Sequence, residues 1–374
     1  MGIIRLLLAI AVVLTHAGPI YGLTYIDGLI AVQSFFIISG FYMSLILNEK
    51  YNQEKSYKLF ISNRLLRLFP AYIFIIIISF IGTYLSHNPI ISDFSRVNIF
   101  SKIYLIVINI IIVGQDTTLF LGLDAKGSLH YVKHFYNSNP QIHYFMLCPQ
   151  AWSLSLELMF YSIAPFLVRR KLSIVLVIMA LLFILRMVIY SQGMYYDPWT
   201  YRFFPTELFF FLSGNVAYRI YKKLTLLSDP KIETARKAGL AMLSCIVIFL
   251  FWFNYCPVNY IIKQYAFYIF LTFSIPFIFL YTKGFSTDKF IGELSYPVYI
   301  THLFVMAFCV PFAEKVIYHF STSKDKHWIY YLESTLAVVI SLVFSYLVVI
   351  VLIKRIDDFR EKRVEKYRKR MKFS

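Results

Sequence analysis

The sequence predicts an all-α, polytopic integral membrane protein with about ten transmembrane helices and one re-entrant segment. Three observations lead to this prediction. The 374 residues are 59% hydrophobic and only 15% charged, which is far less charge than a soluble domain of this length carries. Apolar runs long enough to cross a bilayer recur along nearly the whole chain. The first run lacks a small-residue cleavage site and is followed almost at once by a second, which argues against a cleaved signal peptide.

Ten apolar runs are the expected spans. They cover residues 3–22, 28–47, 68–86, 148–168, 172–190, 206–221, 238–255, 265–281, 290–312 and 332–353. One further run, 103–114, is short for a span. If it crossed the bilayer, the basic segment 169–171 would lie outside, against the positive-inside rule. A re-entrant or interfacial 103–114 avoids this conflict.

The distribution of charge sets the orientation. With 103–114 re-entrant and both termini cytoplasmic, the cytoplasmic segments carry roughly three times as many Lys and Arg residues as the outer ones. The positive-inside distribution of Lys and Arg therefore accounts for the net charge of +17, which does not indicate a nucleic-acid partner. We expect a membrane domain over residues 1–355 and a basic cytoplasmic tail over 356–374. The tail is expected to be solvated and to face lipid headgroups, with a specific binding partner as the weaker alternative.

Arg5 and His16 are ionisable groups at the two ends of the apolar run "RLLLAIAVVLTH". Eleven helical steps of about 100° bring both side chains to nearly the same face, roughly 16 Å apart along the axis. Ionisable groups at membrane depth are costly, so they indicate a functional site. The alternative is that Arg5 is a snorkelling anchor and His16 a hydrogen-bonded packing residue. Spacing alone leaves both interpretations open.

Arg64 and Arg67 lie one helical turn apart, just before the third span. Arginine forms forked, charge-assisted hydrogen bonds to phosphate oxygens, which makes the pair a candidate phosphate site. The alternative is that both residues are a positive-inside signal and nothing more.

Three ionisable residues are expected at a similar depth in the outer halves of successive spans, namely Glu157, Arg186 and Glu207. Tyr161 lies one turn after Glu157. A catalytic role for Glu157 and a structural ion-pair network of all three are both consistent with the sequence. Arg186, Glu207 and Tyr161 are the expected polar groups of an internal cavity.

His302 is expected at mid-depth in the ninth span. Together with His16, it indicates a polar cavity in the middle of the bundle, although histidines also occur as packing residues. The sequence contains no GxSxG elbow, no HExxH and no metal-ligand spacing of cysteines. We therefore predict neither a metal site nor a serine-hydrolase centre.

Five motifs in order resemble membrane acyltransferase family 3. They are Arg5-x10-His16, "GLIAVQSFFIISGFYMS" (28–44), Arg64-x-x-Arg67-x-x-Pro70, "WSLSLELMFY" (152–161) and "LSYPVYITH" (294–302). The resemblance covers nearly the whole chain. The family includes bacterial enzymes that O-acetylate lipopolysaccharide O-antigen, peptidoglycan, exopolysaccharides and Nod factors. It uses a cytoplasmic acyl-coenzyme A donor and an acceptor on the outer side of the membrane.

The resemblance implies a multi-pass O-acetyltransferase of the bacterial inner membrane, with acetyl-CoA as co-substrate. It implies that Arg5 and His16 are essential, that Arg64 and Arg67 form the donor-binding RxxR pair, and that Ser39 of "FFIISGF" belongs to the donor site. It also implies a re-entrant loop after the third span. The expected partners are the acyl-CoA donor, a glycan or lipid-linked glycan acceptor, and the lipid bilayer.

The expected chemistry is general-base catalysis by His16, with a covalent acyl-imidazole on the same residue as the alternative. Some family members carry an additional extracytoplasmic SGNH hydrolase domain, which is not expected in this chain, so a separate protein or the bundle itself would complete the transfer. The outer loop 87–147 is expected to shape acceptor choice. The alternative function is a transporter or flippase of a polysaccharide precursor, because carriers also place polar groups at mid-depth.

Overall fold

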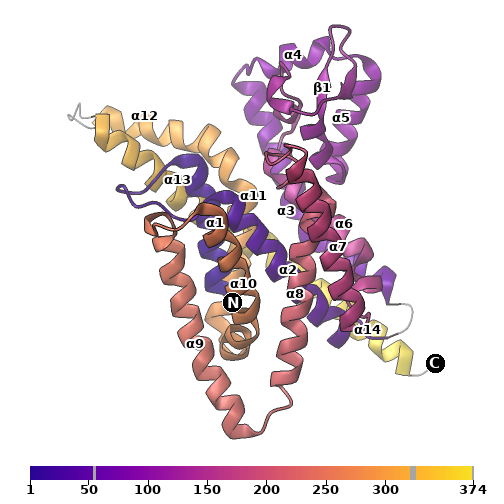
Figure 1. The fold of residues 1–374 in the computed structure, drawn as a ribbon. Coiled ribbons are helices and arrows are strands. Elements are labelled where there is room, and N and C mark those ends of the chain that lie inside the picture. Colours follow the sequence, from indigo (N-terminus) through magenta and orange to yellow (C-terminus); the bar gives the residue numbers. More distant parts are fainter. Residues whose placement is uncertain (54–55, 321–325, 373–374) are drawn as a thin grey trace.

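The structure is a computed structural model that describes residues 1–53, 56–320 and 326–372 of the chain. It is built almost entirely of helices (Figure 1), which confirms the all-α fold class. The α-helices are α1 (Gly2–Ala17), α2 (Gly28–Glu49), α3 (Tyr57–Leu85), α4 (Ile90–Arg96), α5 (Ile99–Ile111), α6 (Trp152–Leu167), α7 (Leu172–Ser191), α8 (Phe204–Leu224), α9 (Asp229–Trp252), α10 (Tyr260–Thr282), α11 (Ser286–Phe304), α12 (Val310–Phe320), α13 (Lys326–Val348) and α14 (Lys354–Lys372). One antiparallel hairpin, β1 (Leu121–Leu123) with β2 (Leu129–Tyr131), pairs Gly122 with His130.

Seven helical segments of the described residues are long and apolar enough to cross a membrane, which confirms a multi-pass membrane protein. They are Gly28–Glu49, Tyr57–Leu85, Leu172–Ser191, Asp229–Tyr255, Tyr260–Thr282, Ser286–Val316 and Leu332–Lys369. The remaining expected spans, 3–22, 148–168 and 206–221, each coincide with a helix as well, namely α1, α6 and α8.

Several helix boundaries differ from the expected spans, and two of these differences bear on the site. Helix α1 ends at Ala17 rather than at residue 22, because Gly18 has a φ of 92° and Pro19 follows it. Helix α3 begins at Tyr57 rather than at residue 68. Polar side chains lower the hydropathy of its first turns without interrupting the helix. Arg64 and Arg67 consequently lie within α3, on a rigid element.

Helices α2 and α8 form the tightest contact in the centre of the bundle. A Cβ atom on Gly40 would lie 1.9 Å from the carbonyl oxygen of Phe211, and one on Gly214 would lie 2.0 Å from that of Ile37. Only glycine permits two backbones to approach this closely. Ser39, the neighbour of Gly40, is therefore held on a helix whose position against α8 is fixed.

Helix α1 is held at its first turn by α11. The carboxylate of Asp288 accepts hydrogen bonds from the backbone N–H groups of Gly2 at 2.8 Å and Ile3 at 3.0 Å. These donors have no partner within their own helix, so a carboxylate at this position caps it. The two helices that carry Arg5 and His302 are thus fixed to each other.

Residues 86–151 form a cap at one end of the bundle, which contains α4, α5 and the hairpin (Figure 1). Helix α5 reaches into the bundle, where the carbonyl of Asn109 accepts a hydrogen bond from the hydroxyl of Tyr72 on α3. The chain then turns, and the Gly114 N–H donates to Ser155 Oγ of α6 at 2.9 Å. From there the chain returns to the hairpin, so it enters and leaves on the same side. That residues 103–114 are re-entrant in the membrane stays a prediction.

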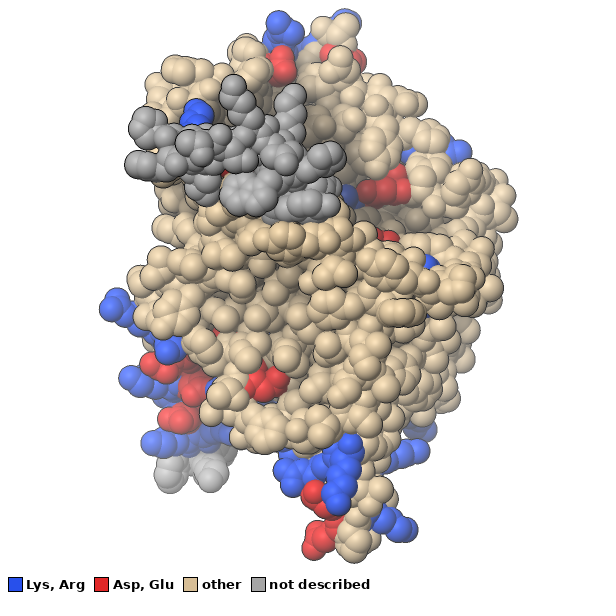
Figure 2. Space-filling model, turned by 90° about the vertical axis from the view of Figure 1, so that its left-hand side faces the viewer, with Lys and Arg blue, Asp and Glu red and all other residues tan. Residues whose placement is uncertain are grey.

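The opposite end of the molecule, called the basic end below, carries α14. Figure 2 shows Lys and Arg side chains gathered at this end, below a broad belt of uncharged residues. The expected basic tail over residues 356–374 is helical in its described part; many of its side chains are exposed, and one face of the helix is packed against the bundle. Arg363 donates to Asn63 Oδ1 at 2.7 Å and to Ser62 Oγ at 2.9 Å, and Val364 is 3% exposed. One face of α14 packs on α3, which a count of charges does not reveal.

Candidate functional site

A cavity of about 700 Å³ lies inside the bundle and extends to the basic end. Its walls come from α1, α2, α3, α6, α10, α11 and α14. Six of the residues singled out in the sequence line it, namely Arg5, Ser39, Arg64, Arg67, Glu157 and Tyr161. The RxxR pair, the first arginine and the "FFIISGF" serine are therefore brought together from the first three helices of the chain.

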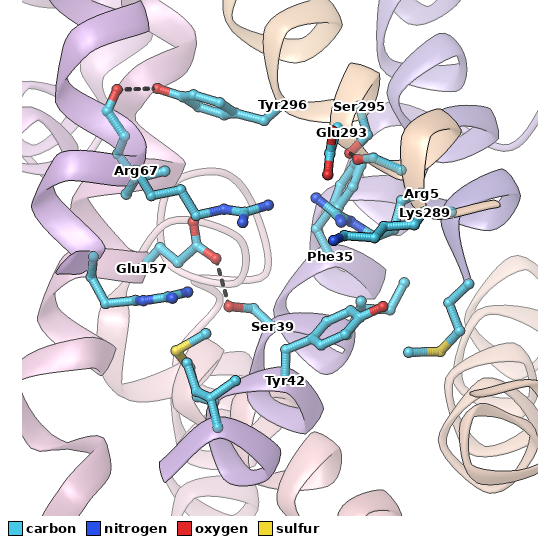
Figure 3. Close-up of a pocket in the computed structure, with 18 of the residues that line it drawn as sticks. Arg5, Phe35, Ser39, Tyr42, Arg67, Glu157, Lys289, Glu293, Ser295 and Tyr296 are labelled. Atoms are coloured by element: carbon cyan, nitrogen blue, oxygen red, sulfur yellow. Dashed lines mark hydrogen bonds between the residues drawn. The ribbon is translucent and has the colours of Figure 1, made fainter. Parts of the chain in front are cut away.

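Arg5, Arg64 and Arg67 have no carboxylate partner among the residues that the structure describes. Figure 3 shows Arg67 and Arg5 extending into the cavity from opposite walls, with Lys289 beside Arg5. Within the described parts of the chain, none of the ion pairs closer than 4 Å includes Arg5, Arg64 or Arg67. Arg64 is 8% exposed, and its Nε finds no hydrogen-bond acceptor there. Concentrated positive charge in a concave site attracts anions, and guanidinium groups favour phosphate.

Glu157 lies in the same cavity and accepts a hydrogen bond of 2.5 Å from Ser39 Oγ (Figure 3). The guanidinium of Arg5 is within electrostatic range of this carboxylate and lies 5.9 Å from the centre of the Tyr42 ring. Glu157 thus places a carboxylate in the same cavity as Arg5, Arg64 and Arg67. It takes no part in the ion pair between Arg186 and Glu207, with which the sequence grouped it.

Arg186 and Glu207 lie outside this cavity and bind each other. Arg186 Nη1 donates to Glu207 Oε1 at 3.2 Å, and both side chains are almost fully buried. Gln33 of α2 donates to both carboxylate oxygens at 3.0 Å, and Arg186 also donates to the Thr200 carbonyl at 2.6 Å. The expectation that Arg186 and Glu207 are polar groups of the cavity is therefore wrong. Their charges balance each other, and they join α7, α8 and α2.

Replacing Arg186 by methionine is expected to destabilise the protein by about 3–5 kcal/mol, because it leaves the buried Glu207 carboxylate without its cation. Thermal unfolding of the purified protein in detergent measures this loss. The double variant Arg186→Met/Glu207→Gln is the control and should recover most of the stability. An Arg186→Met protein with unchanged stability but no activity would contradict a structural role for the pair.

His16 and His302 lie together, but neither lines the cavity. Their ring centroids are 5.3 Å apart. His302 is fully buried, and its Nδ1 lies 2.6 Å from the Tyr299 carbonyl oxygen, which can only accept. Nδ1 therefore carries the hydrogen, and Nε2 is a bare acceptor with no partner in the described structure. The expected neighbourhood of two histidines is present, but His16 is exposed and His302 is packed behind it.

Phe35 and Tyr299 lie at the boundary between the cavity and the histidine pair. Both line the cavity, with ring centroids 6.2 Å apart, and the Tyr299 ring lies 5.9 Å from that of His302. The hydroxyl of Tyr299 is fixed by Ser153 Oγ at 2.6 Å and by the Gln150 carbonyl at 3.0 Å. Sequence reasoning quoted Tyr299 within "LSYPVYITH" but gave it no role. A hydroxyl in mid-span, which needs a buried partner, was the available signal.

Arg202 is a second residue to which the sequence gave no role. It lies on the cap side of the histidines. It forms an ion pair of 2.9 Å with Asp197 and lies 4.4 Å from the centre of the Trp152 ring. Burial raises the pKa of Asp197, and the Arg202 guanidinium opposes this rise. Arg202 is within electrostatic range of His16. A guanidinium that rests on the Trp152 ring therefore lies within electrostatic range of the exposed histidine.

A search of curated proteins and a search of solved structures each found no match to this chain. A family model described as "Acyltransferase domain" matches residues 1–354. The match includes every helix that lines the cavity except α14, and it includes both histidines. The resemblance indicated by the five motifs is confirmed. The chain therefore belongs to membrane acyltransferase family 3 and is a membrane acyltransferase.

Proposed function

We propose that the protein transfers an acyl group, specifically acetyl, from cytoplasmic acyl-CoA to a hydroxyl of an extracytoplasmic cell-surface glycan such as O-antigen or exopolysaccharide. The observation that carries this proposal is the cavity in which Arg5, Arg64 and Arg67 have no carboxylate partner among residues 1–53, 56–320 and 326–372. In this proposal the membrane is the bacterial inner membrane, and both termini are cytoplasmic. The excess of Lys and Arg at the basic end supports that orientation.

The donor binds with its nucleotide phosphates at Arg64 and Arg67. The thin pantetheine arm then runs along α1, past Arg5, toward His16. The rise between these two residues, roughly 16 Å, suits the length of such an arm. To reach the histidines the arm passes between Phe35 and Tyr299, because these rings close the cavity on that side.

The chemical step takes place at His16. Its imidazole accepts the proton of the acceptor hydroxyl, the hydroxyl oxygen attacks the thioester carbonyl carbon, and a C–O bond forms as the C–S bond breaks. The coenzyme A thiolate leaves and receives the proton from His16. His302 acts as a positioning residue, because its bare Nε2 can accept a hydrogen bond from the His16 ring and hold its orientation. Glu157 and Ser39 hold the donor side of the site.

Radiolabelled acetyl-CoA mixed with the purified protein and extracted glycan tests the proposal. Label in the glycan, with release of free coenzyme A, is the expected result. Transport of a lipid-linked glycan in proteoliposomes without any label transfer would instead support a flippase and contradict the proposal. Mass spectrometry of surface polysaccharide from cells with and without the gene identifies the sugar and the hydroxyl.

A further inference from the structure

Helix α14 begins where the family match ends, yet it forms part of the cavity wall. Lys354 and Arg360 line the cavity from this helix, together with the carboxylates of Asp357, Asp358 and Glu361. We propose that Arg360 is a third phosphate-binding arginine of the donor site and that α14 is the wall that places it there. This inference rests on the proposed function, in which the donor is an acyl-CoA.

Arg360 is buried and incompletely bonded. It is 7% exposed, and one guanidinium nitrogen donates to Asp357, one turn earlier on the same helix. Its Nε is buried without an acceptor among the described residues. A buried guanidinium with an unmade hydrogen bond is unfavourable unless a ligand supplies the missing acceptor. A phosphate oxygen is such an acceptor.

The surroundings of Arg360 match an anionic ligand. Arg360 lies within electrostatic range of both Arg64 and Arg67, so the three guanidinium groups repel one another. Placing like charges together in a buried site is costly, and a multiply charged anion removes that cost. Coenzyme A carries a pyrophosphate and a 3′-phosphate at its nucleotide end, which suits three arginines better than two.

The position of α14 is fixed by contacts made away from the cavity. Arg363, one turn after Arg360, binds Ser62 and Asn63, which directly precede Arg64 on α3. Arg368 donates to the carbonyl of Glu49 at 3.2 Å, at the end of α2. These bonds align the guanidinium of Arg360 with the RxxR pair, so its place in the cavity is built into the fold.

The test compares Arg360→Met with Arg355→Ala, both measured for coenzyme A affinity by calorimetry in a neutral detergent. Methionine keeps the apolar stem of the arginine and removes only the charge. We expect Arg360→Met to weaken binding by about 10- to 100-fold, the effect of one charge-assisted hydrogen bond. Arg355 is exposed and does not line the cavity, so its variant should bind like the parent protein. Acetyl-pantetheine, which lacks the nucleotide phosphates, should be used equally by all three proteins.

Equal coenzyme A affinity in the parent and Arg360→Met would overturn the inference and leave the proposed function standing. Failure of the parent protein itself to bind coenzyme A would instead overturn the proposed function. Anionic lipid is the other source of phosphate. If Arg360→Met loses stabilisation by phosphatidylglycerol vesicles but keeps its coenzyme A affinity, the ligand is a headgroup and the inference is wrong.

Discussion

Replacing His16 by alanine is expected to lower the rate of acyl transfer by about 10²- to 10⁴-fold and to leave acyl-CoA binding unchanged, because the variant loses the general base alone. The separation of the two effects follows from the structure, in which His16 is exposed and does not line the cavity that holds the arginines. The turnover number with labelled acetyl-CoA and the dissociation constant for coenzyme A, measured on the same preparation, test both halves of the prediction.

His87→Asn is a suitable control for this experiment. His87 is an exposed turn residue with a φ of 49°, which asparagine tolerates, so the variant should keep full activity. His302→Phe, which removes the Nε2 acceptor, should lower the turnover number without changing donor affinity. Full activity in His16→Ala would return His16 to the role of a packing residue and remove the proposed chemical step.

The double variant Arg64→Met/Arg67→Ala is expected to show the opposite pattern, with acyl-CoA affinity reduced by about 10²-fold or more. Each charge-assisted hydrogen bond contributes roughly 1.5–3 kcal/mol, and two arginines are removed. Methionine is chosen at position 64 because that side chain is buried against its neighbours. The Michaelis constant for the donor and the coenzyme A dissociation constant should both rise.

Arg67→Lys and Arg236→Ala complete this series. Lysine keeps the charge but loses the planar fork, so it should restore only part of the affinity. Arg236 forms an exposed pair with Glu233 on α9, away from the cavity, and its loss should have no effect on the donor. Unchanged coenzyme A binding in the double variant would contradict the proposal that the RxxR pair binds phosphate. It would favour the alternative that both arginines are only a positive-inside signal.

Hydropathy predicts how deep a polar residue lies in the membrane, but it does not predict how that residue is rotated about its helix axis. Hydropathy identifies where a helix lies along the membrane normal. It placed Glu157, Arg186 and Glu207 at one level. Which of these side chains face each other depends on helix packing, and only Arg186 and Glu207 meet. Glu157 instead accepts a hydrogen bond from Ser39, which is 118 residues earlier in the sequence.

The motifs contain Arg5, Arg64 and Arg67, which line the cavity, but they do not contain Arg360, which lies in a run of charged residues. Arg5, Arg64 and Arg67 could be recognised because they stand in apolar surroundings, where a charge needs a reason. Arg360 stands among many charges, where the default interpretation is a solvated surface. The hydrogen bonds that argue against this interpretation join Arg363 to Ser62 and Asn63, about 300 residues earlier. A local sequence pattern cannot predict bonds over such a separation.

The two rings of Phe35 and Tyr299, at the boundary between the cavity and the histidine pair, have a consequence for the membrane potential. In the proposed orientation they stand between a cavity open to the cytoplasm and a histidine that faces the other compartment. A pore at this level would let protons leak and would dissipate the membrane potential, which is worth about 2.3 kcal/mol per charge at 100 mV. In that orientation the two rings would keep the bilayer insulating between turnovers. The acyl arm of the bound donor would block the same opening during turnover.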